Sequence, residues 1–180
     1  MTPLLHVQTP TAGIVGPGRP DQPGTTGLLI DGSETVGTTY TSTDGAGVGA
    51  WVWRKRPNGW IVVDGDTGWV KAAVSGGADG HQVYLRRTST YVRLKGRGTL
   101  TVSGYGAQLL TVPVGYRPEI ADPTAGGDYH DLTWVQDYTT FKTAFLTKAG
   151  VLSLGNGPTA NAAFSLNLTW HTAQPWPTSI

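Results

Sequence analysis

The chain has 180 residues, no cysteine and a formal net charge of +1. The lack of cysteine excludes a disulfide framework, a thiolate metal site and a cysteine nucleophile, and a charge so close to zero disfavours a nucleic-acid binder. No stretch approaches the roughly 18 apolar residues of a membrane span, and the first residues lack the features of a secretory signal. We therefore expect no nucleic-acid partner and no membrane insertion. We also expect that the chain is synthesised in a reducing cytoplasm.

Composition favours strands and turns over helices. The chain holds 26 glycines and 12 prolines but only two glutamates, and no window repeats apolar residues at helical spacing. Short β-rich runs separated by turn residues predict an all-β fold, either a sandwich, a jelly roll or a barrel. The length predicts one domain, or one domain with an appendage.

Residues 1–38 are rich in proline and glycine yet carry several apolar side chains. The five prolines between residues 3 and 23 exclude a regular helix or a central strand. A purely solvated linker does not explain the apolar residues, so we expect an extended arm that docks on a neighbouring protein; a disordered tail is the alternative. The candidate anchoring residues are Leu4, Leu5, Val7, Ile14 and Val15.

Residues 39–75 contain a predicted tryptophan-rich β-hairpin. Residues 50–55 and 60–64 are β-rich runs, and Pro57-Asn58-Gly59 between them is a strong turn signal. Strand alternation is expected to place Trp51 and Trp53 on one face.

The tryptophans of this hairpin region allow two interpretations. Exposed rings on a β-sheet stack on sugars, and a cation beside a ring adds roughly 0.5 to 2 kcal/mol. Alternatively, the rings pair across the hairpin, which is marginal alone and therefore packs on another copy of the chain. We prefer the second interpretation and expect a compact collar with oligomer contacts at Trp51, Trp53, Trp60 and Trp69.

Residues 76–180 are expected to form an antiparallel β-sandwich or jelly-roll-like domain. The segment from Ser75 to Gly80 is the candidate hinge before it, because glycines and a serine cluster there. Short strands are then predicted at residues 82–87, 90–95, 99–102, 109–112, 133–135, 141–146, 150–154 and 163–170.

Cations are concentrated between residues 54 and 97, where nine Lys and Arg residues face three Asp residues. One interpretation is that they lie on the solvent faces of edge strands and block edge-to-edge pairing. The other is a patch for an anionic partner, such as a polyanionic glycan. The candidate contacts for such a partner are Arg86, Arg87, Arg93 and Lys95.

Motifs that carry catalysis are missing. The four histidines have no metal-ligand spacing, and there is no phosphate loop and no G-x-S-x-G. The cluster from Asp128 to Asp131 is interpreted as an exposed loop, and the Asp64-Gly65-Asp66 run lacks the later ligands of a calcium loop. We therefore expect no enzyme, no catalytic residue, no metal and no cofactor.

The run from Thr39 to Trp60, followed by Val62 to Trp69, closely resembles a segment of minor tail proteins and related virion proteins of phages that infect actinobacteria. Shorter stretches at residues 110–118, 150–152 and 176–179 are similar to elements of the β-rich domain that follows this segment in those proteins. The resemblance implies a non-enzymatic virion component, a homotrimer, assembled in the host cytoplasm and released by lysis.

The chain departs from fibre-like members of that family, since no collagen-like or coiled-coil shaft precedes the hairpin. Two positions are therefore open: one on the tail, and one on the capsid shell as a decoration protein or head-fibre relative. We expect residues 1–38 to anchor the chain to phage capsid or tail proteins, and residues 76–180 to project outward. The alternative function is a carbohydrate-binding module or adhesin that recognises host cell-wall glycan.

Overall fold

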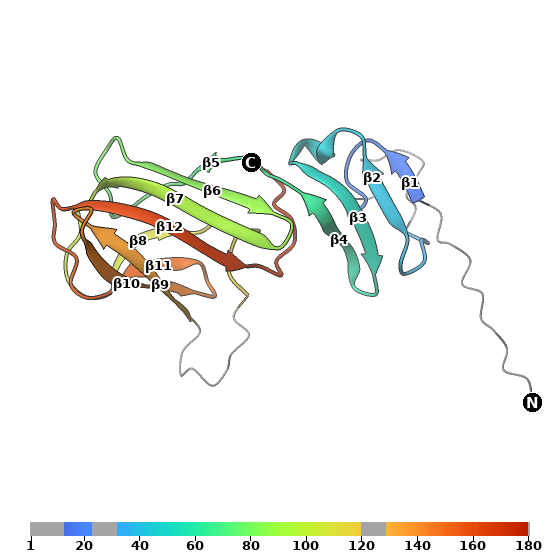
Figure 1. Ribbon diagram of the computed structural model, residues 1–180. Coiled ribbons are helices and arrows are strands. Elements are labelled where there is room, and N and C mark those ends of the chain that lie inside the picture. Colours follow the sequence, from blue (N-terminus) through green and yellow to red (C-terminus); the bar gives the residue numbers. More distant parts are fainter. Residues whose placement is uncertain (1–12, 23–31, 120–128, 180) are drawn as a thin grey trace, which may run out of the picture.

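The computed structural model describes residues 13–22, 32–119 and 129–179. These residues form twelve strands and one short 3-10 turn, η2 (Gly45–Gly47), and no α-helix, which confirms the predicted all-β fold. The strands make two units that lie side by side (Figure 1). The small one is a four-stranded mixed sheet and the large one a curled, eight-stranded antiparallel sheet.

The small sheet has the strand order β1-β2-β3-β4. It consists of β1 (Gly13–Gly16), β2 (Thr39–Ser42), β3 (Ala50–Arg56) and β4 (Gly59–Gly65). The β3–β4 hairpin turns at the predicted Pro57-Asn58-Gly59, where Gly59 has a φ of 120° that favours glycine.

The large sheet has the strand order β5-β6-β7-β12-β9-β10-β11-β8. Its strands are β5 (Val70–Lys71), β6 (Gln82–Thr88), β7 (Tyr91–Thr99), β8 (Ala107–Thr111), β9 (Tyr129–Gln136), β10 (Thr140–Thr147), β11 (Val151–Leu154) and β12 (Ala163–His171). The predicted strand at residues 99–102 does not form on its own: β7 ends at Thr99, and Leu100 makes an isolated bridge to Gly77.

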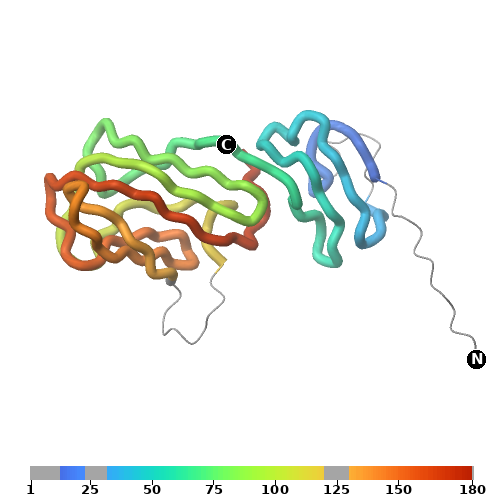
Figure 2. The backbone as a smooth tube through the Cα atoms, in the orientation of Figure 1, coloured from blue at the N-terminus to red at the C-terminus, as the bar shows by residue number. Residues whose placement is uncertain are grey.

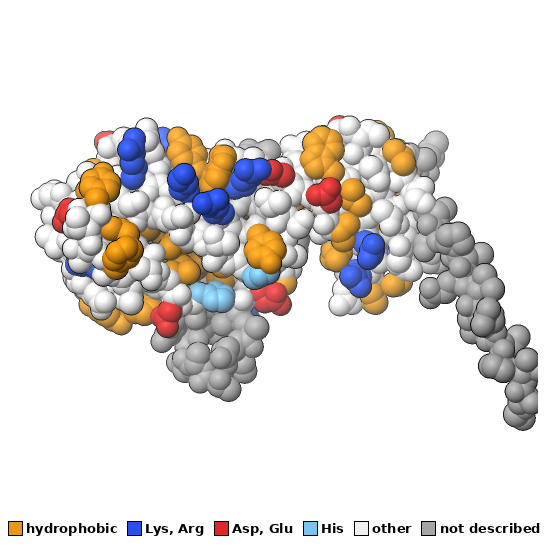
Figure 3. Space-filling model, in the orientation of Figure 1, with side chains coloured by type: hydrophobic (Ala, Val, Ile, Leu, Met, Phe, Trp, Pro, Cys, Tyr) orange, Lys and Arg blue, Asp and Glu red, His pale blue; other side chains and the backbone are white. Residues whose placement is uncertain are grey.

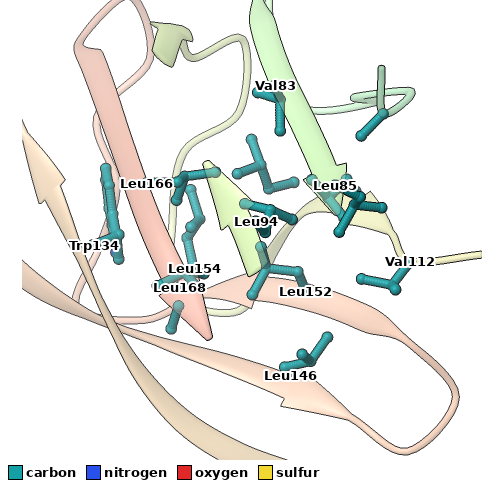
Figure 4. Close-up of a cluster of buried hydrophobic side chains, with 14 of the residues drawn as sticks. Val83, Leu85, Leu94, Val112, Trp134, Leu146, Leu152, Leu154, Leu166 and Leu168 are labelled. Atoms are coloured by element: carbon teal, nitrogen blue, oxygen red, sulfur yellow. The ribbon is translucent and has the colours of Figure 1, made fainter. Parts of the chain in front are cut away.

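The large sheet curls around one apolar core. β12 pairs with β7 along its whole length but with β9 at only two positions, so the sheet folds over between these strands. Near the other end, Val74 bridges to Leu110 of β8 and brings the two margins together. Leucine and valine side chains from both halves fill the space between them (Figure 4).

The small sheet has its own core, and the last residue of that core comes from the far end of the chain. Tyr40, Trp53 and Val62 are buried in this core together with Trp176. The indole N–H of Trp176 donates to the carbonyl oxygen of Val48 at 2.8 Å. A Cβ on Gly65 would lie 2.7 Å from the Trp176 ring, so the indole needs a glycine beside it.

Strand β3 does not keep the alternation that the sequence predicts. Trp51 is 45% exposed whereas Trp53 is 1% exposed, and Ala50 is buried with Trp53 although the two are three positions apart. The β3–β4 register shifts on both sides of Val52, and such a bulge breaks the period of two. Trp51 and Trp53 therefore occupy different environments rather than one shared face.

The proposed hinge between residues 75 and 80 lies within the large unit. The Gly76 N–H donates to the Leu109 carbonyl at 2.9 Å, and the Thr101 N–H donates to the Gly76 carbonyl at 2.9 Å. The chain instead passes between the sheets at residues 66–69, ahead of β5. Even there it is tied down, because the Asp66 N–H donates to the Gly49 carbonyl at 2.7 Å.

Part of the expected N-terminal arm belongs to the small sheet, namely strand β1. β1 pairs in parallel with β2 as an edge strand, and Ile14 packs against the small core while Val15 is exposed. Arg19 is buried, with its guanidinium 5.2 Å from the Trp53 ring. Leu4, Leu5 and Val7, with the rest of residues 1–12, lie outside the described residues.

The C-terminal segment, residues 172–179, runs along the boundary between the two units (Figure 2). From the small unit, Arg19 Nη1 donates to the carbonyl oxygen of Pro177 at 2.8 Å. From the large unit, Arg87 donates to the carbonyl oxygens of Gln174 and Pro175, each at 2.9 Å. We call this segment the C-terminal clasp, because it binds both sheets through buried arginines.

Candidate functional site

Strand alternation builds a polar outer face on the large sheet. In β7, Val92 and Leu94 are fully buried, so Tyr91, Arg93 and Lys95 lie on the opposite, solvent-facing side, and so does Arg97. The neighbouring strands add their own alternate residues to this face. These are Gln82, Tyr84, Arg86 and Thr88 of β6, and Ser165, Asn167, Thr169 and His171 of β12. We call this surface the outer face.

The strand register sets these residues in rows across the sheet. Lys95 is paired with Tyr84 on one side and Asn167 on the other, which places a cation between a ring and an amide. Arg93 hydrogen-bonds the Asn167 side-chain oxygen at 3.2 and 3.1 Å. One row further along, Tyr91 packs on His171 with ring centroids 4.0 Å apart.

One arginine of the outer face is already neutralised. Arg86 forms a two-point ion pair with Asp66, in which Arg86 Nε donates to Asp66 Oδ1 at 2.8 Å. The hydrogen bond from Arg86 holds the pKa of Asp66 below its usual range, with help from the Gly68 N–H. The Arg86 guanidinium also lies 5.9 Å from the Trp69 ring, so the pair fixes a half-exposed indole at the margin of the face.

In the described part of the chain, Arg93, Lys95 and Arg97 of β7 form no ion pair with a carboxylate. Among the described residues, the ion pairs are Arg19 with Asp21 and Arg86 with Asp66. Arg93 donates to the side-chain amide oxygen of Asn167, and Arg97 donates to that of Gln82 at 3.4 Å. Both acceptors are neutral. The outer face is therefore a positively charged surface along β7.

Two shallow grooves cross this surface and meet at Trp69. The first, of about 570 Å³, runs between Trp69, Tyr84, Lys95 and Arg97. The second, of about 430 Å³, runs between Trp69, Arg86, Tyr91 and Arg93. Figure 3 shows Lys and Arg side chains gathered among hydrophobic rings on this side of the large unit. Together the grooves form an elongated, solvent-open site lined by rings and cations.

The candidate polyanion contacts divide between two faces of β6. Arg86, Arg93 and Lys95 lie on the outer face, but Arg87 is only 4% exposed and points the other way. It donates to four backbone carbonyls, those of Ser89, Gly115, Gln174 and Pro175. Burial lowers its pKa to about 10, so it stays charged at neutral pH. Arg87 is thus a junction residue, and it is unavailable to a ligand on the outer face.

The four candidate tryptophans also separate. Trp53 fills the small core, and Trp60 packs at its margin with its ring 6.3 Å from Tyr40 in an edge-to-face contact. Trp51 lies half-exposed on the small unit, whereas Trp69 belongs to the grooves of the large one.

Sequence reasoning missed Tyr84, Tyr91 and Arg97 as groove residues. The signal that could have found all three is strand alternation, applied across the predicted strands that became β6 and β7.

The outer face offers aromatic rings, hydroxyl and amide groups and cations. Among the described residues, no group of three or more His, Asp or Glu side chains gathers in a way that could hold a metal ion. Nor does any helix in the described part of the chain have the length and apolarity to cross a bilayer. His130 contacts the Glu119 carbonyl at 3.0 Å, and Asp128 lies outside the described residues. The outer face can stack on flat apolar groups, donate hydrogen bonds and attract anions.

Comparison with solved structures finds a distant similarity. No family model matches the chain, and no curated protein matches it. Among solved structures, the chain is similar to the head domain of lactococcal phage bIL170, described as a receptor-binding domain. The two share 14% identity with a TM-score of 0.39, over 58% of this chain and 96% of that one. At this TM-score the similarity is distant.

Proposed function

We propose that this chain is a non-enzymatic structural protein of a bacteriophage particle. The observation that carries the proposal is the run from Thr39 to Trp69, which resembles a segment of virion proteins of phages that infect actinobacteria. This run coincides with strands β2, β3 and β4 and with the connection to the large sheet. The resemblance therefore covers three of the four strands of the small sheet and most of its core, which a chance match of a loop would not do.

Attachment to the capsid or tail is assigned to the N-terminal end of the small unit. β1 is the edge strand of its sheet, and Val15 is 60% exposed on it. An open strand edge binds another extended chain through backbone hydrogen bonds. The apolar residues Leu4, Leu5 and Val7 precede this edge and supply side chains for the same contact.

Self-association, with a trimer as the proposed state, is assigned to the hairpin. Trp51, Ile61 and Val63 on β3 and β4 are each more than one third exposed, and β4 ends the sheet. Large apolar side chains exposed together on one hairpin are typical of a surface that another copy covers. Trp53 does not belong to the proposed contact surface, because it is buried in the core of the small sheet.

The test is the copy number of this chain on purified phage particles. Deleting residues 1–12 keeps β1 and Arg19, so we expect a folded protein that no longer joins particles. Deleting residues 1–22 removes both and serves as a control that also weakens the small unit. The full-length chain should be found on particles by mass spectrometry, with its density on the shell or the tail by electron microscopy. Absence of the full-length chain from particles would overturn the proposal.

A second candidate function is a carbohydrate-binding adhesin. The observation that favours it is the solvent-open groove pair, with Trp69, Tyr84 and Tyr91 exposed along one face. The two functions are compatible if the large unit projects from the particle toward the host surface.

A further inference from the structure

We infer that the outer face binds a linear anionic glycan, with phosphate or carboxylate groups held by β7 and sugar rings held by the flanking aromatic residues. The inference names a ligand class for the adhesive role above and rests on the proposed function only for its biological setting. Three features of the face point to this ligand.

The first feature is a row of unneutralised charge. Arg93, Lys95 and Arg97 are alternate residues of one strand, so the Cα atoms of successive members are roughly 7 Å apart along it. None of them lies within ion-pair distance of a carboxylate of residues 13–22, 32–119 or 129–179, and the grooves run past all three. A row of like charges in a groove attracts a chain that carries repeated negative charge.

The second feature is the position of the aromatic rings. Trp69 and Tyr84 border the first groove, and Tyr91 borders the second. Their exposed fractions are between 37% and 54%, so each ring offers a free surface while its remainder is held by the sheet. The C–H face of a sugar ring stacks on such a surface, and the ring loses little conformational freedom on binding.

The third feature is the uncharged polar side chains beside the cations, which favour a glycan over a nucleic acid as the ligand. On the β12 side the cations are flanked by uncharged hydroxyl and amide side chains, namely Ser165, Asn167 and Thr169. These groups match the many hydroxyls of a sugar. A nucleic-acid surface is expected to be more strongly basic than a chain of net charge +1, and Asp66 lies within this face.

The experiment is an NMR titration of the full-length isolated chain with four probes. They are a poly(glucosylglycerol phosphate) teichoic acid, hyaluronan, neutral dextran and a single-stranded dT20 oligonucleotide. We expect shifts confined to β6, β7 and β12 with one or both anionic glycans, weakened by added salt. Teichoic acid and hyaluronan distinguish phosphate from carboxylate. Binding of dextran with equal strength, preference for the oligonucleotide, or no binding at all would overturn the inference.

Matched variants locate the site. The double change Lys95→Gln with Arg97→Gln should weaken glycan binding at least tenfold, and Tyr84→Ala should weaken it several-fold. Arg54→Gln removes an exposed cation from the small unit and should leave binding unchanged. Equal losses in all variants would contradict the location. Because the titration uses isolated protein, loss of glycan binding leaves particle attachment standing, and absence from particles leaves glycan binding standing.

Discussion

The guanidinium carbon of Arg87 lies 4.7 Å from the ring centroid of Trp176, so a buried cation of the large sheet contacts an indole that completes the core of the small one. The two residues are 89 positions apart in the chain. Their contact joins β6, the C-terminal clasp and the β3–β4 hairpin into one packed junction. The stability of the small unit is therefore expected to depend on residues far from it in sequence.

Replacing Trp176 with alanine should destabilise the small unit. Truncating a buried aromatic side chain costs about 3 to 5 kcal/mol, and here it also leaves the Val48 carbonyl without its indole donor. Hydrogen exchange should show faster exchange of β3 and β4 amides, with the large sheet little changed. Phe141→Ala, at a position that is 76% exposed, is the control. Unchanged protection of β3 in the Trp176 variant would contradict the role of the clasp.

Replacing Arg87 with lysine should also destabilise the junction, despite the retained charge. One ammonium group cannot reach the four carbonyls that the guanidinium contacts. Each buried carbonyl left unpaired costs about 1 to 3 kcal/mol. Chemical denaturation should show that the free energy of unfolding falls by about 2 kcal/mol or more.

The adjacent Arg86→Lys change is the matched control for Arg87, since it alters a solvent-accessible ion pair, which contributes little to stability. Similar losses at the two positions would show that the inward geometry of Arg87 is unimportant.

The Asp66–Arg86 pair should make part of the stability depend on acid pH. Because the folded pKa of Asp66 is lowered, mainly by Arg86, its contribution is present above pH 3.8 and is lost as the pH falls through the folded pKa. In Arg86→Gln, a carboxyl NMR titration should find the Asp66 pKa raised toward 3.8. Asp44 is the internal control, because its pKa is lowered by the Gly18 N–H and Ser42 instead and should not move.

Self-association should depend on the hairpin rather than on the grooves. Trp51→Ala combined with Ile61→Ser removes two exposed apolar side chains from the small unit, so the mass from light scattering should fall toward that of one chain. Tyr84→Ala, in the first groove, is the control and should keep the wild-type mass. A monomeric wild-type protein, or an unchanged mass in the double variant, would contradict the assigned surface.

Local sequence signals predicted the parts of the fold that neighbouring residues determine. The Pro57-Asn58-Gly59 turn predicted the hairpin, and the β-rich run at residues 90–95 predicted strand β7. Alternation along β6 places Arg86 and Arg87 on opposite faces, so the prediction that both contact one anionic partner is wrong for Arg87.

Other features had no local signal. The β3 bulge that separates Trp51 from Trp53 is set by pairing with β4 and not by residue type alone. The parallel pairing of β1 with β2 joins segments 26 positions apart. The prolines around β1 are typical of irregular chain, so the local sequence did not predict this strand. The burial of Trp176 in the small core depends on the arrangement of both sheets, so no pattern near residue 176 could have indicated it.

The C-terminal clasp also imposes an order on biosynthesis. Domains generally begin to fold from the N-terminal side while the chain is being translated, yet the N-terminal sheet acquires its final indole only after residue 176 has left the ribosome. The part of the protein that is made first is therefore completed last. Until then, the nascent sheet exposes the apolar surface that Trp176 later covers. During this interval the sheet is expected to be more susceptible to proteolysis and aggregation.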